Sequence, residues 1–433
     1  MRILIISTFF PPLNSIGSLR PYSWAKYWSR TGHEVSVLTT QKTPSDQDLK
    51  MSHHGFTVHE VPFASFLNSW KQDYQNTQQP KNGSGIPKTS GWKSSLIKVF
   101  HQMRATRGIF NACRMPDFTD LWIKPAFQFI KHQGPWDLVV STAGPYAVHV
   151  VAEKLKRKGL AKKWIADFRD PWSDNFAFPG LFPFNCIEKW WEEKLMRSAD
   201  LITTVSAPFA EKFAKKYPAK KVLAVENGFD PDDLEALPPN SIFPADHKFR
   251  IVHTGSIYQG KRDFLPLFQA IAELNESEPK LLDALEVIFV GSRVGNLNEQ
   301  IHHFGLAAWV KNQGMVSREN ALCMQRDAQA LLFLPWNDLA FPGVLTGKIF
   351  EYLFSGTPII AIGGSGIEMS QQLILDAQAG TVLSNVPEIK DFLRQQLSAP
   401  SLQKTVVAQA IMDKYNRKIL AAKLLNESNL CLK

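Results

Sequence analysis

The sequence predicts an α/β protein built from two doubly wound domains. At 433 residues the chain is too long for one ordinary hydrophobic core. Short apolar runs alternate with amphipathic stretches, and this series starts a second time in the C-terminal half. Such alternation is typical of a parallel sheet with helices on both faces. A hydrophobic content of 44% and a charged content of 21% fit a globular protein.

The first series of elements begins with MRILIISTFFPP, which we interpret as a buried strand that ends in a loop. A helix over Trp24–Arg30 and the strand GHEVSVLTT complete a βαβ unit. The further strand candidates are Phe56–Val61, Leu138–Ser141, Trp164–Asp167 and Leu201–Val205. Helices are expected over Tyr146–Lys158 and Ile187–Ser198, and the whole series forms a first domain over residues 1–240.

The second series follows a proline-rich segment, LPPNSIFPADH, which we interpret as the linker at Leu237–His247. Its strand candidates are Phe249–Thr254, Leu285–Val290, Val310–Gln313, Ala330–Leu334, Pro358–Ala361 and Thr381–Leu383. We expect a second domain over 241–402 and a final helix from about Gln403 to Glu427, within 403–433.

The positive charge of the chain is concentrated in one segment. The net charge is +9 and the pI is about 9.2. Between Phe66 and Arg114, eight basic residues stand against one acidic residue, which gives about +7. The remainder is nearly balanced, and no helix-turn-helix, zinc-finger or RNP-like pattern is present. Binding to nucleic acid is therefore not expected.

The sequence favours a cytoplasmic location. No stretch approaches the roughly 18 to 20 apolar residues that span a bilayer. The apolar N-terminus meets Pro11 and Pro12 too early for a signal peptide. The four cysteines lie far apart and make neither a CxxC pair nor a dense disulfide framework.

A basic amphipathic helix is predicted inside the 66–114 insertion, over residues 92–110. Apolar residues recur there at helical spacing among basic ones: Trp92, Leu96, Val99, Phe100, Met103 and Phe110 among Lys93, Lys98, Arg104 and Arg107. Such a helix can lie on an anionic membrane, or guide an anionic lipid-linked acceptor. Packing on the core with a solvated basic face is the alternative.

The segment most informative about function is Phe341–Ile362, FPGVLTGKIFEYLFSGTPIIAI. It joins a glycine-containing loop, a helix that carries Lys348 and Glu351, and an apolar strand. The helix N-terminus offers unpaired N–H groups and partial positive charge, so a diphosphate can rest near Val344–Gly347 with Lys348 adding a full charge. Glu351 lies on the same helix face, where a carboxylate can accept hydrogen bonds from ribose hydroxyls.

This run resembles the nucleotide-binding segment of family 4 glycosyltransferases, which are retaining enzymes with the GT-B fold, in the branch with a KIFEYL-type helix. Glu351 matches the second of the two family glutamates, and Gly343 stands at the position of the first. ADFRDPW, which contains Asp167–Trp172, resembles the family run ADLRDPW, and MPDFTDLW and VENGFD match further landmarks. The resemblance implies two Rossmann-like domains that face each other across a cleft, with a closing helix that crosses back to the first domain.

The resemblance also implies which residues bind the donor, namely Gly17, Gly255, Gly291, Val316, Thr346, Gly347 and Glu351. Lys348 and a basic residue at the position of the family lysine, which either Lys261 or Arg262 matches, are expected to neutralise the departing diphosphate. Ser256 stands where the family usually has an arginine. For each of these positions a turn glycine or a solvated charge is the structural alternative.

In the first half, the loop PPLNSIGSLR holds Gly17 and Arg20 just before the expected helix, a place suited to a donor or acceptor phosphate. The family commonly has a histidine at the position of His149, facing the donor sugar, so His149 is a candidate catalytic residue. Arg169 and Asp170, with Arg20, are candidate acceptor ligands. Structural roles, including pairing of Arg169 with Asp170, are the alternatives.

The sequence therefore predicts a retaining glycosyltransferase that moves a sugar from a nucleoside diphosphate, with UDP expected, to a glycan or lipid-linked acceptor in surface-polysaccharide assembly. No DxD motif at a strand end suggests a required metal, and no metal or other cofactor is expected. A UDP-sugar epimerase on the same scaffold is one alternative. A catalytically silent GT-B protein that binds glycan or membrane is the other.

Overall fold

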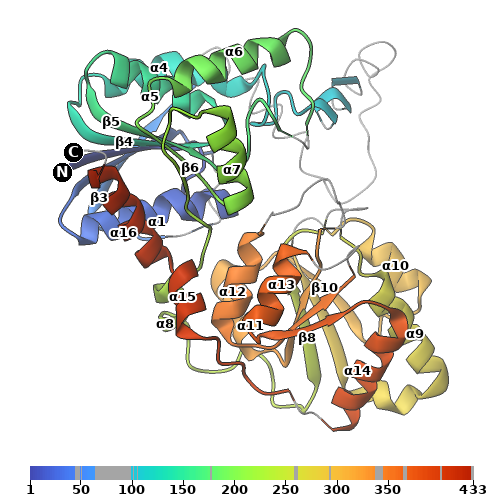
Figure 1. Ribbon diagram of the computed structural model, residues 1–433. Helices are drawn as coiled ribbons and strands as arrows, with labels where there is room; N and C mark the ends of the chain where they lie inside the picture. Colours follow the sequence, from blue (N-terminus) through green and yellow to red (C-terminus); the bar gives the residue numbers. More distant parts are fainter. Residues whose placement is uncertain are drawn as a thin grey trace. The chain divides into compact units, whose positions relative to one another are not determined.

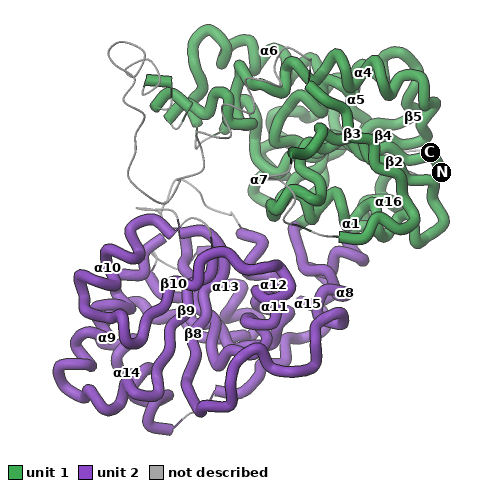
Figure 2. The backbone as a smooth tube through the Cα atoms, turned by 180° about the vertical axis from the view of Figure 1, so that it is seen from behind, with its two compact units in different colours: residues 1–226, 421–433 green, residues 227–420 purple. Residues whose placement is uncertain are grey.

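The computed structural model describes residues 1–43, 49, 51–63, 99–100, 102–104, 106–175, 178–257, 262–291, 294–336, 345–363, 368–399 and 402–430. It forms two compact units, coloured separately in Figure 2. Unit 1 contains Met1–Glu226 and Ala421–Lys433, and unit 2 contains Asn227–Leu420.

Unit 1 is built on a seven-stranded parallel sheet with the order β3-β2-β1-β4-β5-β6-β7. Its strands are β1 (Arg2–Ile6), β2 (Glu34–Thr40), β3 (Phe56–Val61), β4 (Trp136–Ala143), β5 (Ala161–Phe168), β6 (Leu201–Thr204) and β7 (Val222–Ala224). The inner strand β1 places Ile5 opposite Val37 of β2 and Val140 of β4. These apolar strands are buried on both faces, as a parallel sheet requires.

Helices cover both faces of this sheet (Figure 1). One face carries α4 (Ile123–Ile130), α5 (Ala147–Arg157), α6 (Phe184–Met196) and α7 (Ala207–Lys216), with the 3-10 turn η3 (Phe118–Trp122) before α4. The other face carries α1 (Ile16–Arg30) and the last helix, α16 (Arg417–Leu430). The indole N–H of Trp28 donates to the carbonyl of Ala421 at 2.9 Å, which ties α16 to α1.

Unit 2 has a six-stranded parallel sheet with the order β10-β9-β8-β11-β12-β13. The strands are β8 (Phe249–Thr254), β9 (Leu285–Val290), β10 (Val310–Gly314), β11 (Ala330–Phe333), β12 (Ile359–Ile362) and β13 (Gly380–Leu383). On one face α9 (Leu265–Ser277), α10 (Leu297–His303) and α14 (Val386–Ser398) enclose one apolar cluster. On the other face α11 (Arg318–Asp327), α12 (Gly347–Ser355), α13 (Met369–Asp376) and α15 (Gln409–Tyr415) enclose a second.

The prediction of two doubly wound parallel sheets is confirmed. Every strand expected from the sequence is present, within a few residues at the ends. The short strand β7 was not predicted. Its three residues are each only partly buried, so they lack the apolar run that marks the other strands.

The first helix starts earlier than the expected Trp24, at Ile16. Ser15 is its N-cap and accepts a hydrogen bond from the N–H of Gly17, so Gly17 and Arg20 lie inside the helix rather than in a loop before it. Pro21 is tolerated within the helix, although a proline normally indicates a helix boundary.

The expected single final helix is also wrong in detail. It begins at Gln409 and is interrupted at Asn416, which forms a β-bridge with Phe229. The N–H of Phe229 donates to Tyr415 and the N–H of Arg417 donates to Phe229, so backbone pairing replaces helical hydrogen bonds there.

The division between the units comes earlier than the linker expected at Leu237–His247. Phe229 stacks on Phe354 of α12 with ring centroids 4.0 Å apart. Asp233, in the short helix α8 (Pro231–Glu235), bonds to Arg318 of α11 at 2.6 Å. These contacts hold the segment after Glu226 in unit 2, so the expected boundary between 240 and 241 falls inside that unit.

Within the described part of the chain, no helix combines the length and apolar character needed to cross a bilayer.

Candidate functional site

A row of glycines lies at the carboxyl edge of the unit 2 sheet. Gly255 follows β8, Gly291 follows β9 and Gly314 ends β10. The N–H of Gly255 donates to Val290 at 2.6 Å, and the N–H of Gly291 donates to Gly314 at 2.9 Å. A Cβ on Gly291 would lie 2.5 Å from the carbonyl oxygen of Gly255. The strand ends therefore approach each other too closely for side chains, and they leave bare backbone at the edge where α/β sheets bind ligands.

The N-terminus of α12 lies at the same edge. Its N-cap residue, Thr346, makes no side-chain cap, and its hydroxyl oxygen is buried without a hydrogen-bond partner. The first turn contains no acidic residue. The partial positive charge of this helix end, at Gly347 and Lys348, is therefore not neutralised by the helix itself.

Lys348 extends from this helix across Gly255. A Cβ on Gly255 would lie 2.4 Å from Cε of Lys348, and Gly255 has a φ of +100°, so both the space and the backbone conformation favour glycine. The ammonium group is 3.3 Å from Nε2 of His253 and donates to the carbonyl of Ser256 at 3.4 Å. Among the described residues it makes no ion pair with a carboxylate.

A second cation, Arg262, lies close to Lys348. Arg262 is 6% exposed, donates through Nη1 to the carbonyl of Leu334 at 2.8 Å, and lies over the ring of Trp336. The pKa of Lys348 is well below its ordinary value, because burial disfavours the ammonium and because Arg262 repels it, with Glu351 acting in the opposite sense. Two cations held this close favour an anionic ligand. Lys261 lies outside the described residues.

Glu351 is part of an ionic group that joins three helices. Its carboxylate accepts a hydrogen bond from Arg318 at 2.8 Å, and Arg318 also donates to Asp233 at 2.6 Å. The second oxygen of Glu351 is 3.5 Å from the amide of Gln325. Burial disfavours the charge of Glu351, but Arg318 outweighs that effect, so the pKa of Glu351 is lowered and the group is ionised at neutral pH.

Other residues of this edge were only partly anticipated. Val316 follows Gly314, is half-buried and packs against the α12 face, while the neighbouring Met315 is exposed.

Glu368, at the start of α13, was not predicted. Burial raises the pKa of its carboxyl group, while the backbone of Trp336 and the charge of Arg262 act against that shift. Nothing in the local sequence around Glu368 signals this proximity, which results from the order of β11 and β12 in the sheet.

In unit 1, Arg20 forms a buried ion pair instead of lining an open loop. Its guanidinium donates to both carboxylate oxygens of Asp167, at 3.0 and 2.7 Å, and to the carbonyl of Glu226. Thr142 and Thr203 also donate to Asp167, which is completely buried. This pair ties α1 to the ends of β4, β5 and β6, and supports the structural alternative for Arg20.

His149 is likewise part of the core. Its side chain is completely buried, its Nδ1 is 2.7 Å from the hydroxyl of Ser141, and its ring lies 4.6 Å from that of Phe168. Burial lowers the pKa of His149 to about 3, with Asp167 acting in the opposite sense. Nε2 is buried without a hydrogen-bond partner. The ring is therefore covered by its neighbours in unit 1, and its expected role at the donor sugar stays a prediction.

Arg169 lies at the carboxyl edge of the unit 1 sheet, against Gly17. A Cβ on Gly17 would lie 1.7 Å from Nη1 of Arg169. The guanidinium donates to the carbonyls of Ala143 and Gly144, both at 2.9 Å. Asp170 is exposed. The structure therefore brings Gly17 and Arg169 together, while Arg20 is paired with Asp167.

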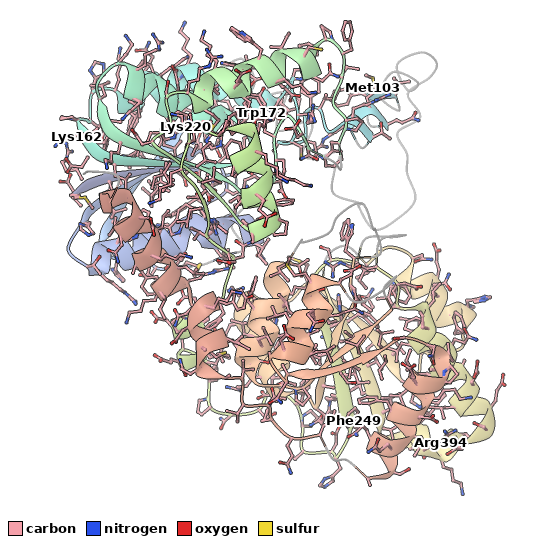
Figure 3. All side chains as sticks on the ribbon, viewed as in Figure 1. Met103, Lys162, Trp172, Lys220, Phe249 and Arg394 are labelled. Atoms are coloured by element: carbon pink, nitrogen blue, oxygen red, sulfur yellow. The ribbon has the colours of Figure 1, made fainter. Side chains whose placement is uncertain are left out.

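The run ADFRDPW ends in a structural anchor. Trp172, labelled in Figure 3, stacks on Tyr146 with ring centroids 4.4 Å apart, and its indole N–H donates to Glu188 at 3.1 Å. Glu188 also bonds to Arg114 at 2.9 Å. This part of the family-like run packs the core and does not extend the site.

The predicted amphipathic helix over 92–110 is described only in part, and Trp92, Lys93, Leu96 and Lys98 lie outside the described residues. Residues 99–100, 102–104 and 106–107 are helical. Phe110 contacts both Phe100 and Phe118, with centroids 5.4 and 4.8 Å apart, while Val99 is half-exposed. At the described end of the segment, Phe100 and Phe110 thus form an aromatic group with Phe118 of η3.

No protein-family model matches this chain, and no curated protein matches it. Solved structures do. The chain is similar to sucrose-phosphate synthase from Thermosynechococcus elongatus, with 13% identity, a TM-score of 0.64, and coverage of 100% of this chain and 99% of that one. It is also similar to WaaG, a glycosyltransferase involved in lipopolysaccharide biosynthesis, with 14% identity, a TM-score of 0.55 and coverage of 99% of each chain.

A third similar structure is that of a putative UDP-N-acetylglucosamine 2-epimerase from Listeria monocytogenes, with 11% identity, a TM-score of 0.54, and coverage of 100% of this chain and 97% of that one. At these identities the likeness establishes the fold. The chain is a two-domain α/β protein of the GT-B architecture, as expected.

Proposed function

We propose that this chain is a glycosyltransferase that moves a sugar from a nucleoside diphosphate to a glycan or lipid-linked acceptor. One observation carries the proposal. Lys348 and Arg262 lie near the N-terminus of α12, at the carboxyl edge of the unit 2 sheet, where Gly255 and Gly291 present backbone without side chains. Two neighbouring cations and free backbone N–H groups suit a diphosphate.

In this proposal the cations act on the leaving group. When the glycosidic bond to the diphosphate breaks, negative charge grows on the phosphate oxygens, and Lys348, Arg262 and Lys261 stabilise it. An anionic ligand also favours the charged form of Lys348, which opposes the lowering of its pKa by burial and by Arg262. Glu351 is proposed to accept hydrogen bonds from the ribose hydroxyls.

The finer features of the reaction are proposals as well. UDP is the expected carrier, and Val316 is proposed to lie beside its base. The acceptor hydroxyl attacks the anomeric carbon from the face that the diphosphate leaves, with retention of configuration. One C–O bond forms, one C–O bond breaks, and the hydroxyl proton passes to a phosphate oxygen. No metal ion is proposed to take part.

Acceptor binding is proposed for unit 1, in the setting of surface-polysaccharide assembly. The support is the close contact of Arg169 with Gly17 at the carboxyl edge of the sheet, with Asp170 exposed beside it. Association with the inner face of an anionic membrane through 92–110 is a further proposal, supported by the local charge of about +7.

A UDP-sugar epimerase is the second candidate, favoured by the similarity to the putative 2-epimerase structure. Such a reaction needs carboxyl groups that exchange a proton at carbon, and Glu368, near Arg262 and with a raised pKa, is a candidate. An epimerase would release UDP, or the epimerised sugar, when no acceptor is present. The Glu368→Gln variant of such an enzyme would lose activity. A silent binding protein would bind donor without any turnover.

The deciding experiment is a thermal-shift screen of UDP-, GDP-, ADP- and dTDP-sugars with a chelator present, followed by an assay of slow donor hydrolysis. Stabilisation with release of nucleoside diphosphate and no epimerised sugar supports the transferase. Epimerised sugar supports the second candidate. No stabilisation by any donor would refute a nucleotide site around Lys348.

A further inference from the structure

His253 is buried at the end of β8, in contact with the lysine of the proposed diphosphate site. Its side chain is 1% exposed. Nδ1 is 2.9 Å from the carbonyl oxygen of Leu332 in β11, and Nε2 is 3.3 Å from the ammonium of Lys348 in α12. The ring also lies beside Phe289 of β9, with centroids 5.7 Å apart. His253 thus joins three strands to the helix that carries the lysine.

The chemistry of these partners determines which nitrogen carries the proton. A carbonyl oxygen only accepts hydrogen bonds, so Nδ1 must donate to Leu332. In a neutral ring Nε2 then has its lone pair free, and that lone pair faces the N–H donors of Lys348. The backbone of β11 therefore orients the acceptor that holds the lysine.

The charged groups around the ring keep it neutral. Lys348 faces it from α12 and Arg262 from the loop after β8. The pKa of His253 is well below its ordinary value, because the ring is buried and because Lys348 and, to a smaller extent, Arg262 repel its charged form, while the bond to Leu332 acts in the opposite sense. At neutral pH the ring is an acceptor without charge.

We infer that His253 is a positioning residue, which holds the ammonium of Lys348 across Gly255 and toward a diphosphate without neutralising its charge. A carboxylate in this place would hold the lysine too, but it would cancel the charge that the ligand requires. The carbonyl of Ser256, the other acceptor at 3.4 Å, is equally uncharged. This inference rests on the proposed function only where it names the diphosphate.

The binding test measures UDP affinity by calorimetry for the wild type, His253→Phe, His253→Gln, Lys348→Met and the double variant His253→Phe/Lys348→Met. We expect His253→Phe and Lys348→Met each to weaken binding about tenfold. Gln keeps an acceptor near the position of Nε2, so His253→Gln should lose less than about threefold. The double variant should match Lys348→Met, because the histidine acts through the lysine.

Unchanged UDP affinity in His253→Phe would overturn the inference. A loss of affinity in the double variant equal to the product of the two single losses would also overturn it. Thermal unfolding of each variant separates misfolding from lost positioning. A merely structural histidine would lower stability without rescue of UDP binding by Gln.

A second experiment needs no nucleotide. It therefore tests this inference separately from the proposed function. In the ligand-free protein, ¹⁵N NMR of the imidazoles should show one ring, absent in His253→Gln, with a protonated Nδ1 and a hydrogen-bonded, unprotonated Nε2. Lys348→Met should shift that Nε2 signal and leave the Nδ1 signal in place. An Nε2 signal unaffected by Lys348→Met would overturn the inference even if UDP binds. If UDP does not bind but the signal shifts, only the proposed function fails.

Discussion

The carboxylate of Glu351 accepts a hydrogen bond from the guanidinium of Arg318 at 2.8 Å, and the same guanidinium bonds to Asp233 at 2.6 Å. A residue expected to bind ribose is therefore held in a fixed position by its neighbours, with its second oxygen only weakly bonded to Gln325. Such support restricts the rotamers of a ligand-binding side chain before the ligand arrives.

Replacing Glu351 by Ala should weaken UDP binding about tenfold, because the ribose loses a charged acceptor. Calorimetry measures the change. Glu319→Ala is the control, since this glutamate is exposed in the first turn of the neighbouring helix α11 and should leave affinity unaltered. Equal affinity in wild type and Glu351→Ala would exclude the ribose role.

Replacing Asp167 by Asn should destabilise unit 1 by about 3–5 kcal/mol, because Arg20 loses its buried counter-charge. Denaturant unfolding gives the difference in free energy. Asp137→Asn removes a partly exposed pair with Lys162 and should cost under about 1 kcal/mol. A similar cost for both variants would contradict the structural role assigned to the Arg20–Asp167 pair.

The same pair predicts a pH dependence. Burial disfavours the charge of Asp167, but Arg20 and the hydrogen-bonded hydroxyls lower its pKa below the ordinary 3.8. The folded state therefore binds its proton less readily than the unfolded state. The contribution of the Asp167 charge to folding stability is complete when the pH is above the ordinary pKa. It is lost as the pH falls through the lowered pKa of the folded state. The free-energy gap between wild type and Asp167→Asn should shrink only in that acidic range.

Gly255→Ala should displace Lys348, since the new Cβ would lie 2.4 Å from its Cε. We expect UDP affinity to fall about tenfold. Gly305→Ala is the matched control, because Gly305 also has a positive φ, of +67°, but no atom within 4 Å of an added Cβ. Both variants should lose about 1 kcal/mol of stability from backbone strain, and only Gly255→Ala should lose affinity. Equal UDP affinities in Gly255→Ala and Gly305→Ala would contradict the contact between Gly255 and Lys348.

Arg262→Gln should lower the rate of donor turnover about 100-fold while weakening UDP binding much less, because the cation acts on charge that grows as the bond breaks. Rates of slow donor hydrolysis and calorimetry give the two quantities. Arg394, which lies in α14 and is labelled in Figure 3, provides the control, and Arg394→Gln should alter neither quantity. Parallel losses in turnover and binding would count against stabilisation of the leaving group.

Lys93→Glu/Lys98→Glu should reduce sedimentation with vesicles that contain anionic lipid, since each basic residue near such a surface contributes about 1 kcal/mol. The control pair Lys158→Glu/Lys162→Glu changes the net charge by the same amount at other exposed lysines. If the two pairs sediment alike, the proposed membrane contact of 92–110 is wrong.

The sheets could be predicted because their strands are continuous apolar runs, and Phe249–Thr254 and Leu285–Val290 begin and end where the sequence indicates. Elements without that signal were misjudged. Pro21 concealed the early start of α1, and the pairing of Asn416 with Phe229, which breaks the last helix, depends on residues far away in the chain.

The candidate site was predicted where its residues share a short motif and missed where they do not. Lys348 and Glu351 follow a glycine-containing loop on one helix, so spacing alone indicated them. His253 had no local signal and was included only as part of a predicted strand. Its partners, Leu332 and Lys348, come from β11 and α12, which lie far away in the sequence. Conversely, Arg20 looked available in the sequence and is buried, since only the fold brings Asp167 to it.

The pairing of Phe229 with Asn416 has a consequence for the modularity of the chain. Asn227–Leu420 leaves unit 1 after Glu226 and returns to it at Ala421. In unit 1 the ammonium of Lys423 donates to the carbonyl of Ala224 at 3.4 Å, so the two ends left by removing that segment are neighbours. Unit 2 is thus an inserted domain whose two ends lie close together in space. A short linker could replace it, or a different domain could take its place. The unit that carries Lys348 is therefore exchangeable at two chain positions that are neighbours in space, with unit 1 left intact.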